Sequence, residues 1–255
     1  MIQGKLIAPG LLLLVLAACA SDGSFDKDRA AMVGATLAAG ALVASSLDES
    51  DVKHMSVQAA AEMDSKNKVA DANNPYALRL TKLVRGMENY NGLRLNFKVY
   101  LSPEINAFAM ADGTVRVYSG LLDAMPDDQV YAVIGHEVGH VALKHSYKQM
   151  REELRTSAAF KAVAAAGGTI GALTSSQLGA IAYQAVNARF SQEDELAADK
   201  YAVKMLHTQG KDPSAMKRAI ETLEKKHGSG GGGFLSSHPS TSQRKSELQK
   251  AINNL

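Results

Sequence analysis

The chain has 255 residues and a formal net charge of +2, with 28 Lys and Arg against 26 Asp and Glu. It contains no Trp, few aromatic residues and no long basic run, so the composition argues against a nucleic-acid groove. Its single cysteine excludes a disulfide within one chain, and its length is sufficient for one compact domain with a sizeable core.

The first 18 residues have the features of a secretory signal peptide. Leu6–Leu16 forms an apolar core that follows a short positively charged segment and is too short to span a bilayer. It ends in Leu16-Ala17-Ala18-Cys19, which fits the bacterial lipobox, in which the cysteine receives a diacylglycerol and becomes the mature N-terminus. We therefore expect residues 1–18 to be removed and Cys19 to be lipidated and membrane-anchored. Ala20, in place of Asp, favours the periplasmic face of the outer membrane.

Residues 19–74 are expected to form a lipid-anchored tether and an N-terminal helical segment. Within them, Ala31–Leu47 is an apolar run of small residues at the lower length limit for a membrane-spanning helix. We interpret this run as a helix that packs on the domain or lies at the membrane surface, with a membrane span as the alternative. Asn73-Asn74-Pro75 combines turn and helix-start signals, so we expect the main domain to occupy residues 75–255.

The start of the main domain predicts one helix followed by one strand. Apolar residues recur at helical spacing over Tyr76–Tyr90, and Asn91-Gly92 is expected to end that helix. Apolar and polar residues then alternate over Leu93–Leu101, which is the pattern of a half-buried strand.

A hairpin is predicted next. Its strands are Ala107–Ala111 and Thr114–Tyr118, and Asp112-Gly113 between them is a strong hairpin turn signal. Asn106–Met110 alternates poorly in polarity and borders this turn, which is consistent with an edge strand that receives an extended peptide by backbone pairing. An ordinary edge strand is the alternative interpretation.

The following helix carries the strongest motif of the chain, His136-Glu137-Val138-Gly139-His140, and Pro126-Asp127-Asp128 opens it with a proline and acids in the first turn. Four residues are close to one helical turn, so the imidazoles of His136 and His140 project from one face and are able to meet one metal ion. A zinc ion held by two imidazoles and one further ligand keeps a position for water, whose proton a neighbouring carboxylate can take. This is the chemistry of peptide hydrolysis.

The surroundings of the motif argue against a chance match on a surface helix. Apolar residues flank it from Val133 to Leu143, which is the composition of a buried helix. Imidazoles and a carboxylate are costly in such a place unless they are paired or ligate a metal. Gly135 and Gly139 each cost about 1 kcal/mol relative to alanine in a helix interior, and they therefore indicate close approach by another backbone.

A third ligand should come from another segment, and Ser191–Asp199 is the best candidate. Glu195 and Asp199 are four residues apart and face the same way on a helix, whereas Glu193 and Asp194 point elsewhere. A solvated acidic helix start is the alternative.

The remaining segments are also predominantly helical. Before the acidic segment, the small-residue run at 162–182 is interrupted by glycines, so we interpret it as a helical hairpin or mobile cover. Further helices are predicted from Asp212 to His227 and from about Thr241 to Leu255, the second of which carries Arg244. Between them lies the flexible glycine run Gly228–Gly233.

Three motifs together resemble a known family. H-E-V-G-H at 136–140, E-L-A-A-D at 195–199 and S-H-P-S at 237–240 are similar, in order and spacing, to those of the gluzincin metallopeptidases that include HtpX and the CAAX prenyl proteases. The similarity extends to Asn106–Ala109 and Tyr118–Leu122, and it is greatest for the small bacterial lipoprotein branch of that family. It spans about residues 75–255.

The resemblance implies roles for the site residues. His136, His140 and Glu195 would bind one zinc ion, Glu137 would be the general base, and Asp199 would orient a histidine ligand. The substrate strand would consist of the segment Asn106, Ala107, Phe108 and Ala109.

Three roles are open for His238. The resemblance implies a catalytic donor aimed at the oxyanion of the tetrahedral intermediate. The loose glycine tether suggests a second state, in which His238 binds the zinc as a fourth ligand and blocks the water position. The third is a loop histidine before a helix. His145 follows His140 by five residues, which is about 140° of helical rotation off the ligand face, so we expect a capping or packing role for it.

The expected fold is α+β, a mainly helical zincin-type domain with a small antiparallel sheet and the H-E-x-x-H motif on a buried helix. The expected function is a zinc-dependent endopeptidase that acts on unfolded or damaged cell-envelope proteins, anchored through Cys19, with envelope proteins as further partners and no nucleic acid. The alternative is an envelope lipoprotein assembly factor or chaperone with a closed zinc site, since an open water position favours an enzyme. The other histidines, His54, His207 and His227, are expected at the surface.

Overall fold

A computed structural model describes residues 47–166, 172–227 and 233–255, which divide into two compact units. The larger unit comprises Asp48–Leu154 and Thr174–Leu255. In the smaller unit, the described residues form the end of helix α7 (His145–Thr156) and helix α8 (Ala158–Ala165). The predicted signal peptide, Cys19, nearly all of the apolar run at 31–47 and most of the glycine run lie outside the described residues.

The larger unit contains a three-stranded sheet with the order β3 (Asn96–Tyr100), β5 (Thr114–Tyr118), β4 (Ala107–Ala109). The hairpin predicted at Asp112-Gly113 is confirmed: β4 and β5 pair antiparallel, and Gly113 has a φ of +91°, which favours glycine. The expectation of a purely antiparallel sheet is wrong, because β3 pairs parallel to β5. The chain reverses direction twice between these two strands, and β4 takes the far edge.

The segment before β3 differs from the prediction. Helix α4 (Pro75–Leu83) is shorter than expected, and Gly86, with a φ of +83°, lies just beyond its end. Asn91-Gly92 does not end a helix but turns a short hairpin between β1 (Asn89–Tyr90) and β2 (Leu93–Arg94). Both turn residues have positive φ, which is the conformation that an Asn-Gly hairpin turn requires. The prediction that Asn91-Gly92 ends a helix is therefore wrong, because the dipeptide connects two strands.

Helices α6 (Asp127–Ala142) and α10 (Gln192–Thr208) pack against each other, and α6 is buried along nearly its whole length, as the sequence predicts. A Cβ atom added to Gly139 would lie 3.2 Å from the Cα and the carbonyl oxygen of Ala198. One added to Gly135 would lie 3.6 Å from the Cα of Ala202. The expected close approach of a second backbone is thus confirmed, and it brings the start of α10 onto the zinc motif of α6.

The other helices complete a mainly helical α+β unit, as predicted. Helix α11 (Ala215–His227) also packs on α6, and α13 packs on α10. The apolar core includes residues of the sheet together with residues of α6, α10 and α11. The remaining helices of this unit are α5 (Ser119–Ala124), α9 (Ser175–Asn187), α12 (Phe234–Ser237) and α13 (Ser242–Asn253).

Helix α3 (Glu49–Lys66) occupies part of the segment that the sequence suggested as a tether. Asp48 caps it through a capping box, and it packs against α9. Its Asp64 receives hydrogen bonds from Arg116 of β5 and from Lys98 and Tyr100 of β3. The compact unit therefore begins at Asp48, whereas the sequence analysis placed the start of the domain at Pro75.

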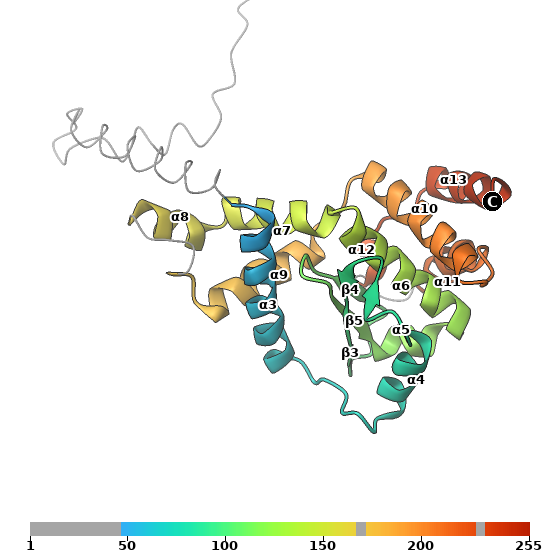
Figure 1. Cartoon of the computed structure of the whole chain (residues 1–255), viewed down its shortest axis with the longest axis horizontal. Coiled ribbons are helices and arrows are strands. Elements are labelled where there is room, and N and C mark those ends of the chain that lie inside the picture. The colour runs from blue at the N-terminus through green and yellow to red at the C-terminus, as the bar shows by residue number, and fades with distance from the viewer. Residues whose placement is uncertain (1–46, 167–171, 228–232) are drawn as a thin grey trace, which may run out of the picture. The chain divides into compact units, whose positions relative to one another are not determined.

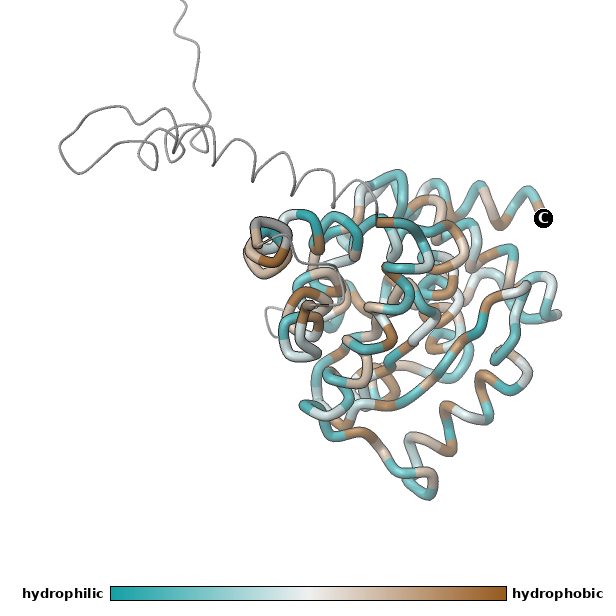
Figure 2. The backbone as a smooth tube through the Cα atoms, turned by 60° about the vertical axis from the view of Figure 1, so that its left-hand side comes forward, coloured by the Kyte–Doolittle hydropathy of each residue, from teal (hydrophilic) through white to brown (hydrophobic). Residues whose placement is uncertain are grey.

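Hydrophilic and hydrophobic residues are mixed along the described backbone (Figure 2). None of the helices in the described part of the chain combines the length and apolar character that crossing a membrane requires. The predicted hairpin or cover at 162–182 includes residues 167–171, which are outside the described residues, and it stays a prediction.

Candidate metal centre

Helix α6 holds His136, Glu137 and His140 in the interior of the larger unit. The two histidines have no exposed surface, and Glu137 is only 1% exposed. Because they are one helical turn apart, their imidazoles face the same point, and their Nε2 atoms lie 3.0 Å from each other. The two imidazoles therefore share one face of the helix, as the spacing predicts.

The first turns of α10 bring two carboxylates to these imidazoles. Ser191 caps α10 by accepting a hydrogen bond from the backbone N–H of Asp194. One turn further on, the Oε1 atom of Glu195 lies 3.3 Å from Nε2 of His140. Asp199, four residues later, has its Oδ1 atom 2.9 Å from Nδ1 of His136. Both carboxylates thus reach the motif, each at a different imidazole.

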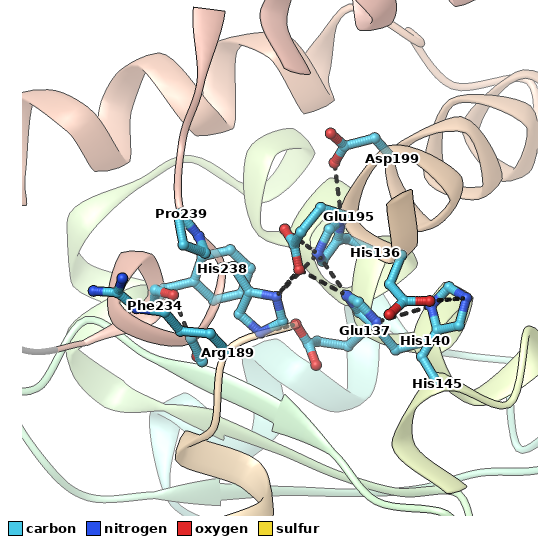
Figure 3. A network of polar contacts seen from close by, with 12 residues as sticks. His136, Glu137, His140, His145, Arg189, Glu195, Asp199, Phe234, His238 and Pro239 are labelled. Carbon is cyan, nitrogen blue, oxygen red and sulfur yellow. Dashed lines mark hydrogen bonds and ion pairs between the residues drawn. The ribbon is translucent and has the colours of Figure 1, made fainter. Parts of the chain in front are cut away.

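His238 arrives from the far end of the chain. Its Nδ1 atom lies 2.8 Å from Oε1 of Glu195 and 3.3 Å from Nε2 of His136 (Figure 3). His136, His140, Glu195 and His238 each offer one ligand atom, and these four atoms lie within 4.8 Å of one another. All four side chains are buried, so the cluster has the compactness and the dryness of a metal site.

The donor chemistry of the cluster fits a zinc ion. An ionised Asp199 only accepts hydrogen bonds, so His136 donates through Nδ1 and its Nε2 presents a lone pair to the cluster. Lone pairs of nitrogen and carboxylate oxygen that crowd together in a buried site repel one another unless a cation or protons lie between them. Imidazole nitrogens and a carboxylate oxygen are ligands that zinc prefers.

Glu137 stands beside the cluster rather than in it. Burial raises the pKa of Glu137, and the nearby imidazoles of His238 and His136 partly oppose that rise. Its Oε1 atom is buried without a hydrogen bond, 3.4 Å from Nε2 of His238. Ala109 of β4 lines the same pocket as this carboxylate. One carboxylate oxygen therefore remains available to a molecule bound next to the cluster.

Arg244 of α13 is the site residue to which the sequence analysis gave no role. Its guanidinium is 1% exposed and donates two hydrogen bonds to Asp199, at 2.8 and 2.7 Å, while its Nη1 lies 2.5 Å from Oε2 of Glu195. Burial alone would raise the pKa of Asp199, but hydrogen bonds from Arg244 and His136 outweigh burial and lower it. Arg244 thus keeps both carboxylates charged and oriented toward the histidines.

The segment around His238 is held from two sides. The imidazole stacks on the ring of Phe234 with 4.3 Å between ring centroids, and its backbone N–H donates to the Phe234 carbonyl. Nη1 of Arg244 donates to the carbonyls of His238 and Pro239, at 3.2 Å each. These contacts aim Nδ1 of His238 at the cluster and its Nε2 at Glu137.

His145 lies against the cluster, contrary to the expected capping or packing role. Lys144, with a φ of +62°, ends the helical path of α6, and α7 begins at His145. The predicted rotation of 140° presupposed a continuous helix, and it therefore does not apply. Nδ1 of His145 lies 3.1 Å from Nδ1 of His140, and its Nε2 lies 3.1 Å from Oδ1 of Asp194. Asp194 contacts His145 and Ser191 and is not among the clustered ligands, as the sequence predicts.

The predicted substrate strand forms one edge of the sheet. Tyr118 donates to the Asn106 carbonyl at 3.0 Å, and Met110 donates to the Thr114 carbonyl at 2.8 Å. By strand alternation, the backbone N–H and C=O groups of Ala107 and Ala109 between them face away from β5, toward the edge that no other described strand pairs, and both residues are buried. On this edge Ala107 donates to the side chain of Asn106, and Phe108 lines a pocket that also reaches Glu137.

Comparison with known proteins gives the family. The family described as "Peptidase family M48" matches residues 80–252. The chain is 44% identical over 210 residues to "Metalloprotease LoiP" of Escherichia coli (strain K12), which covers 82% of this chain and 83% of that protein. It is 36% identical over 248 residues to "Metalloprotease YcaL" of the same organism, covering 97% and 96%.

A third relative is less similar, and the alignment covers a smaller share of both proteins. The "Beta-barrel assembly-enhancing protease" of Escherichia coli (strain K12) is 29% identical over 184 residues, which cover 68% of this chain but only 38% of that relative. With a family match over most of its length and a buried cluster of zinc-type ligands, the chain belongs to peptidase family M48, and it is a zinc metalloendopeptidase.

Proposed function

We propose that this zinc metalloendopeptidase hydrolyses unfolded or damaged proteins of the cell envelope. The observation that carries the proposal is the edge of β4 that no other described strand pairs, beside a pocket that Ala109 and Glu137 both line. A bare strand edge pairs with the backbone of an extended polypeptide, whereas a folded protein has already used its backbone groups internally.

In this proposal His136, His140 and Glu195 hold the zinc ion. When bound, zinc polarises the scissile carbonyl and acidifies the water beside it. Glu137 takes the proton of the attacking water and passes it to the leaving amine. Its raised pKa and its oxygen without a hydrogen bond support this role. Asp199 fixes the lone pair of His136 on the side of the cluster by accepting the proton of Nδ1.

The edge of β4 would orient the substrate by backbone pairing alone. A peptide paired with Ala107 and Ala109 would run past Glu137, because Ala109 and Glu137 line one pocket. Pairing through main-chain groups places little demand on side chains. We therefore expect broad sequence specificity.

The location is part of the proposal. The lipobox at Cys19 supports a lipid anchor, and Ala20 after it supports the periplasmic face of the outer membrane. The name of one relative, a "Beta-barrel assembly-enhancing protease", connects that protein with envelope assembly. Envelope polypeptides that fail to fold near the membrane would then be the substrates and partners of this chain.

The alternative function, an assembly factor or chaperone with a closed zinc site, has one observation in its favour. His238 offers a fourth ligand atom within 4.8 Å of the other three. A site that stays closed would hold an unfolded chain without cutting it. The same assay therefore separates the two functions.

The test uses one polypeptide in two forms. Native ribonuclease A and its reduced, carboxymethylated form have the same sequence, so a difference in cleavage reports folding alone. We expect the zinc-loaded enzyme to cut the unfolded form at many bonds that share no single side chain, and to leave the native form intact. Glu137→Gln serves as the inactive control. Equal cleavage of the native form would contradict the proposal, and binding of the unfolded form without cleavage would favour the chaperone.

A further inference from the structure

His140 is supported differently from His136. The ring of His136 meets the carboxylate of Asp199 directly, and Arg244 holds that carboxylate from its other side. The ring of His140 meets a second imidazole instead, because its Nδ1 lies 3.1 Å from Nδ1 of His145. The chain of contacts continues from Nε2 of His145 to Oδ1 of Asp194, at 3.1 Å.

The direction of these hydrogen bonds follows from the acceptor at the outer end. The carboxylate of Asp194 accepts from the hydroxyl of Ser191 at 2.7 Å and lies in the first turn of α10, where the helix dipole favours a negative charge. A carboxylate has no proton to give, so the contact of 3.1 Å between Nε2 of His145 and Oδ1 of Asp194 places the proton of His145 on Nε2. A hydrogen bond between two Nδ1 atoms needs a lone pair on one and a proton on the other. Because the proton of a neutral His145 is on Nε2, its Nδ1 carries the lone pair and accepts. His140 then donates the proton of its Nδ1.

We propose that His145, whose ring is oriented by Asp194, is a positioning residue for the metal ligand His140. By accepting the Nδ1 proton, His145 holds His140 in the tautomer whose Nε2 lone pair faces the cluster, and it also fixes the rotation of the ring. The inference rests on the proposed assignment of His140 as a ligand. It adds a helix to those that hold the zinc ligands in place, because His145 is the first residue of α7.

The geometry leaves His140 little alternative support. The imidazole of His140 stacks on the ring of Phe190 with 3.9 Å between centroids. This stacking does not replace a hydrogen-bond acceptor for the N–H at Nδ1. Without His145, the buried N–H at Nδ1 loses its partner, and the tautomer with the proton on Nε2 becomes competitive. That proton would occupy the position of the metal. Loss of such an outer partner weakens metal binding by about 10- to 100-fold.

The test compares two substitutions at one position. His145→Leu removes the acceptor, whereas His145→Asn retains it, because the amide oxygen of asparagine stands at the same distance along the side chain as Nδ1 of histidine. Zinc affinity is measured on the metal-free protein by competition with a chelator, and circular dichroism checks the fold of each variant. His207→Leu, at the exposed end of α10, is the matched control.

We expect His145→Leu to bind zinc about 10- to 100-fold more weakly, and His145→Asn and His207→Leu to stay close to the unchanged protein. Nitrogen-15 NMR of the histidines in the metal-free protein gives a second measurement, in which His140 should carry its proton on Nδ1 in the unchanged protein and in His145→Asn. His145→Leu should lose that preference.

Two results would overturn the inference. One is an unchanged zinc affinity and an unchanged His140 tautomer in His145→Leu, and the other is a loss in His145→Asn as large as in His145→Leu, which would mean that the ring acts by packing. Failure of the proposed ligand set looks different, because His140→Ala would then keep the zinc affinity of the unchanged protein.

Discussion

At the scale of single residues, His238 occupies the most consequential position. Its Nδ1 belongs to the same cluster of ligand atoms as His136, His140 and Glu195. A fourth protein ligand there would take the position that the attacking water needs. The position of Nδ1 among the ligand atoms favours the hypothesis of a fourth ligand, and both functional roles of His238 stay predictions.

We expect His238→Ala to raise the turnover of a short, unstructured peptide, because the substitution frees the fourth position while the other three ligands remain. The measurement is kcat on a fluorogenic peptide at saturating zinc, with zinc content determined in parallel and His207→Ala as the control. A fall in kcat of about 100-fold or more would instead identify His238 as a donor to the oxyanion.

The sequence predicted the residues of the metal centre better than the residues that hold them in place. The spacing of His136 and His140 and the helical pairing of Glu195 with Asp199 placed all four on two facing helices, because i and i+4 always share a helix face. Arg244 gave no comparable signal, because its partner Asp199 is 45 residues away in the chain. His145 was misplaced because nothing in the sequence marked the end of α6 at Lys144.

At the scale of elements, the docking of α3 depends on one carboxylate. Asp64 accepts two hydrogen bonds from the guanidinium of Arg116, which is only 2% exposed, and one each from Lys98 and Tyr100. Burial alone would raise the pKa of Asp64, but hydrogen bonds from Arg116 and Lys98 outweigh it and lower the pKa. The charged form is therefore the one that ties α3 to β3 and β5.

We predict that Asp64→Asn lowers the free energy of unfolding by about 3 kcal/mol at pH 7, because it leaves the buried Arg116 without its counter-charge. Since the pKa of Asp64 is lower in the folded state than in the unfolded state, its contribution is fully present above the unfolded pKa and is lost as pH falls through the folded pKa. The deficit should therefore shrink between pH 7 and pH 3 in urea unfolding experiments.

Glu62→Gln is the control for this experiment, because Glu62 lies on the same helix in an i,i+4 ion pair with Lys66, whose side chain is 58% exposed. Such a pair contributes under about 1 kcal/mol. A deficit for Asp64→Asn as small as that of the control, or one that grows on acidification, would refute the role of Asp64.

Local signals in the sequence predicted the elements that depend on local chemistry. The Asp112-Gly113 hairpin and the glycine contacts of α6 were read from one or two residues and are present. The parallel pairing of β3 with β5 was not predicted, because strand direction in a sheet depends on which strands become neighbours. The same holds for α3, which has a polar sequence and is held by partners in β3 and β5 that lie far away in the chain.

At the scale of the whole molecule, the proposal attaches an enzyme for unfolded chains to a membrane through Cys19. If residues 1–19 are exchanged for the signal peptide of a soluble periplasmic protein, we expect the enzyme to move from the membrane fraction to the soluble periplasmic fraction. Mass spectrometry of the unchanged protein should show a diacylglycerol-modified cysteine at its N-terminus. An unmodified cysteine, or a membrane location that survives the exchange, would contradict the anchor.

The most direct test of the account is the substitution Glu137→Gln, because it separates holding the metal from handling the proton. The glutamine has the shape of the glutamate and is not one of the four clustered ligands, so we expect the variant to keep one zinc ion per chain. Its hydrolysis of unfolded ribonuclease A should fall by about 100-fold or more, since a positioned base contributes about 10²- to 10⁴-fold. Loss of zinc from Glu137→Gln, or full activity with the zinc retained, would contradict the assignment.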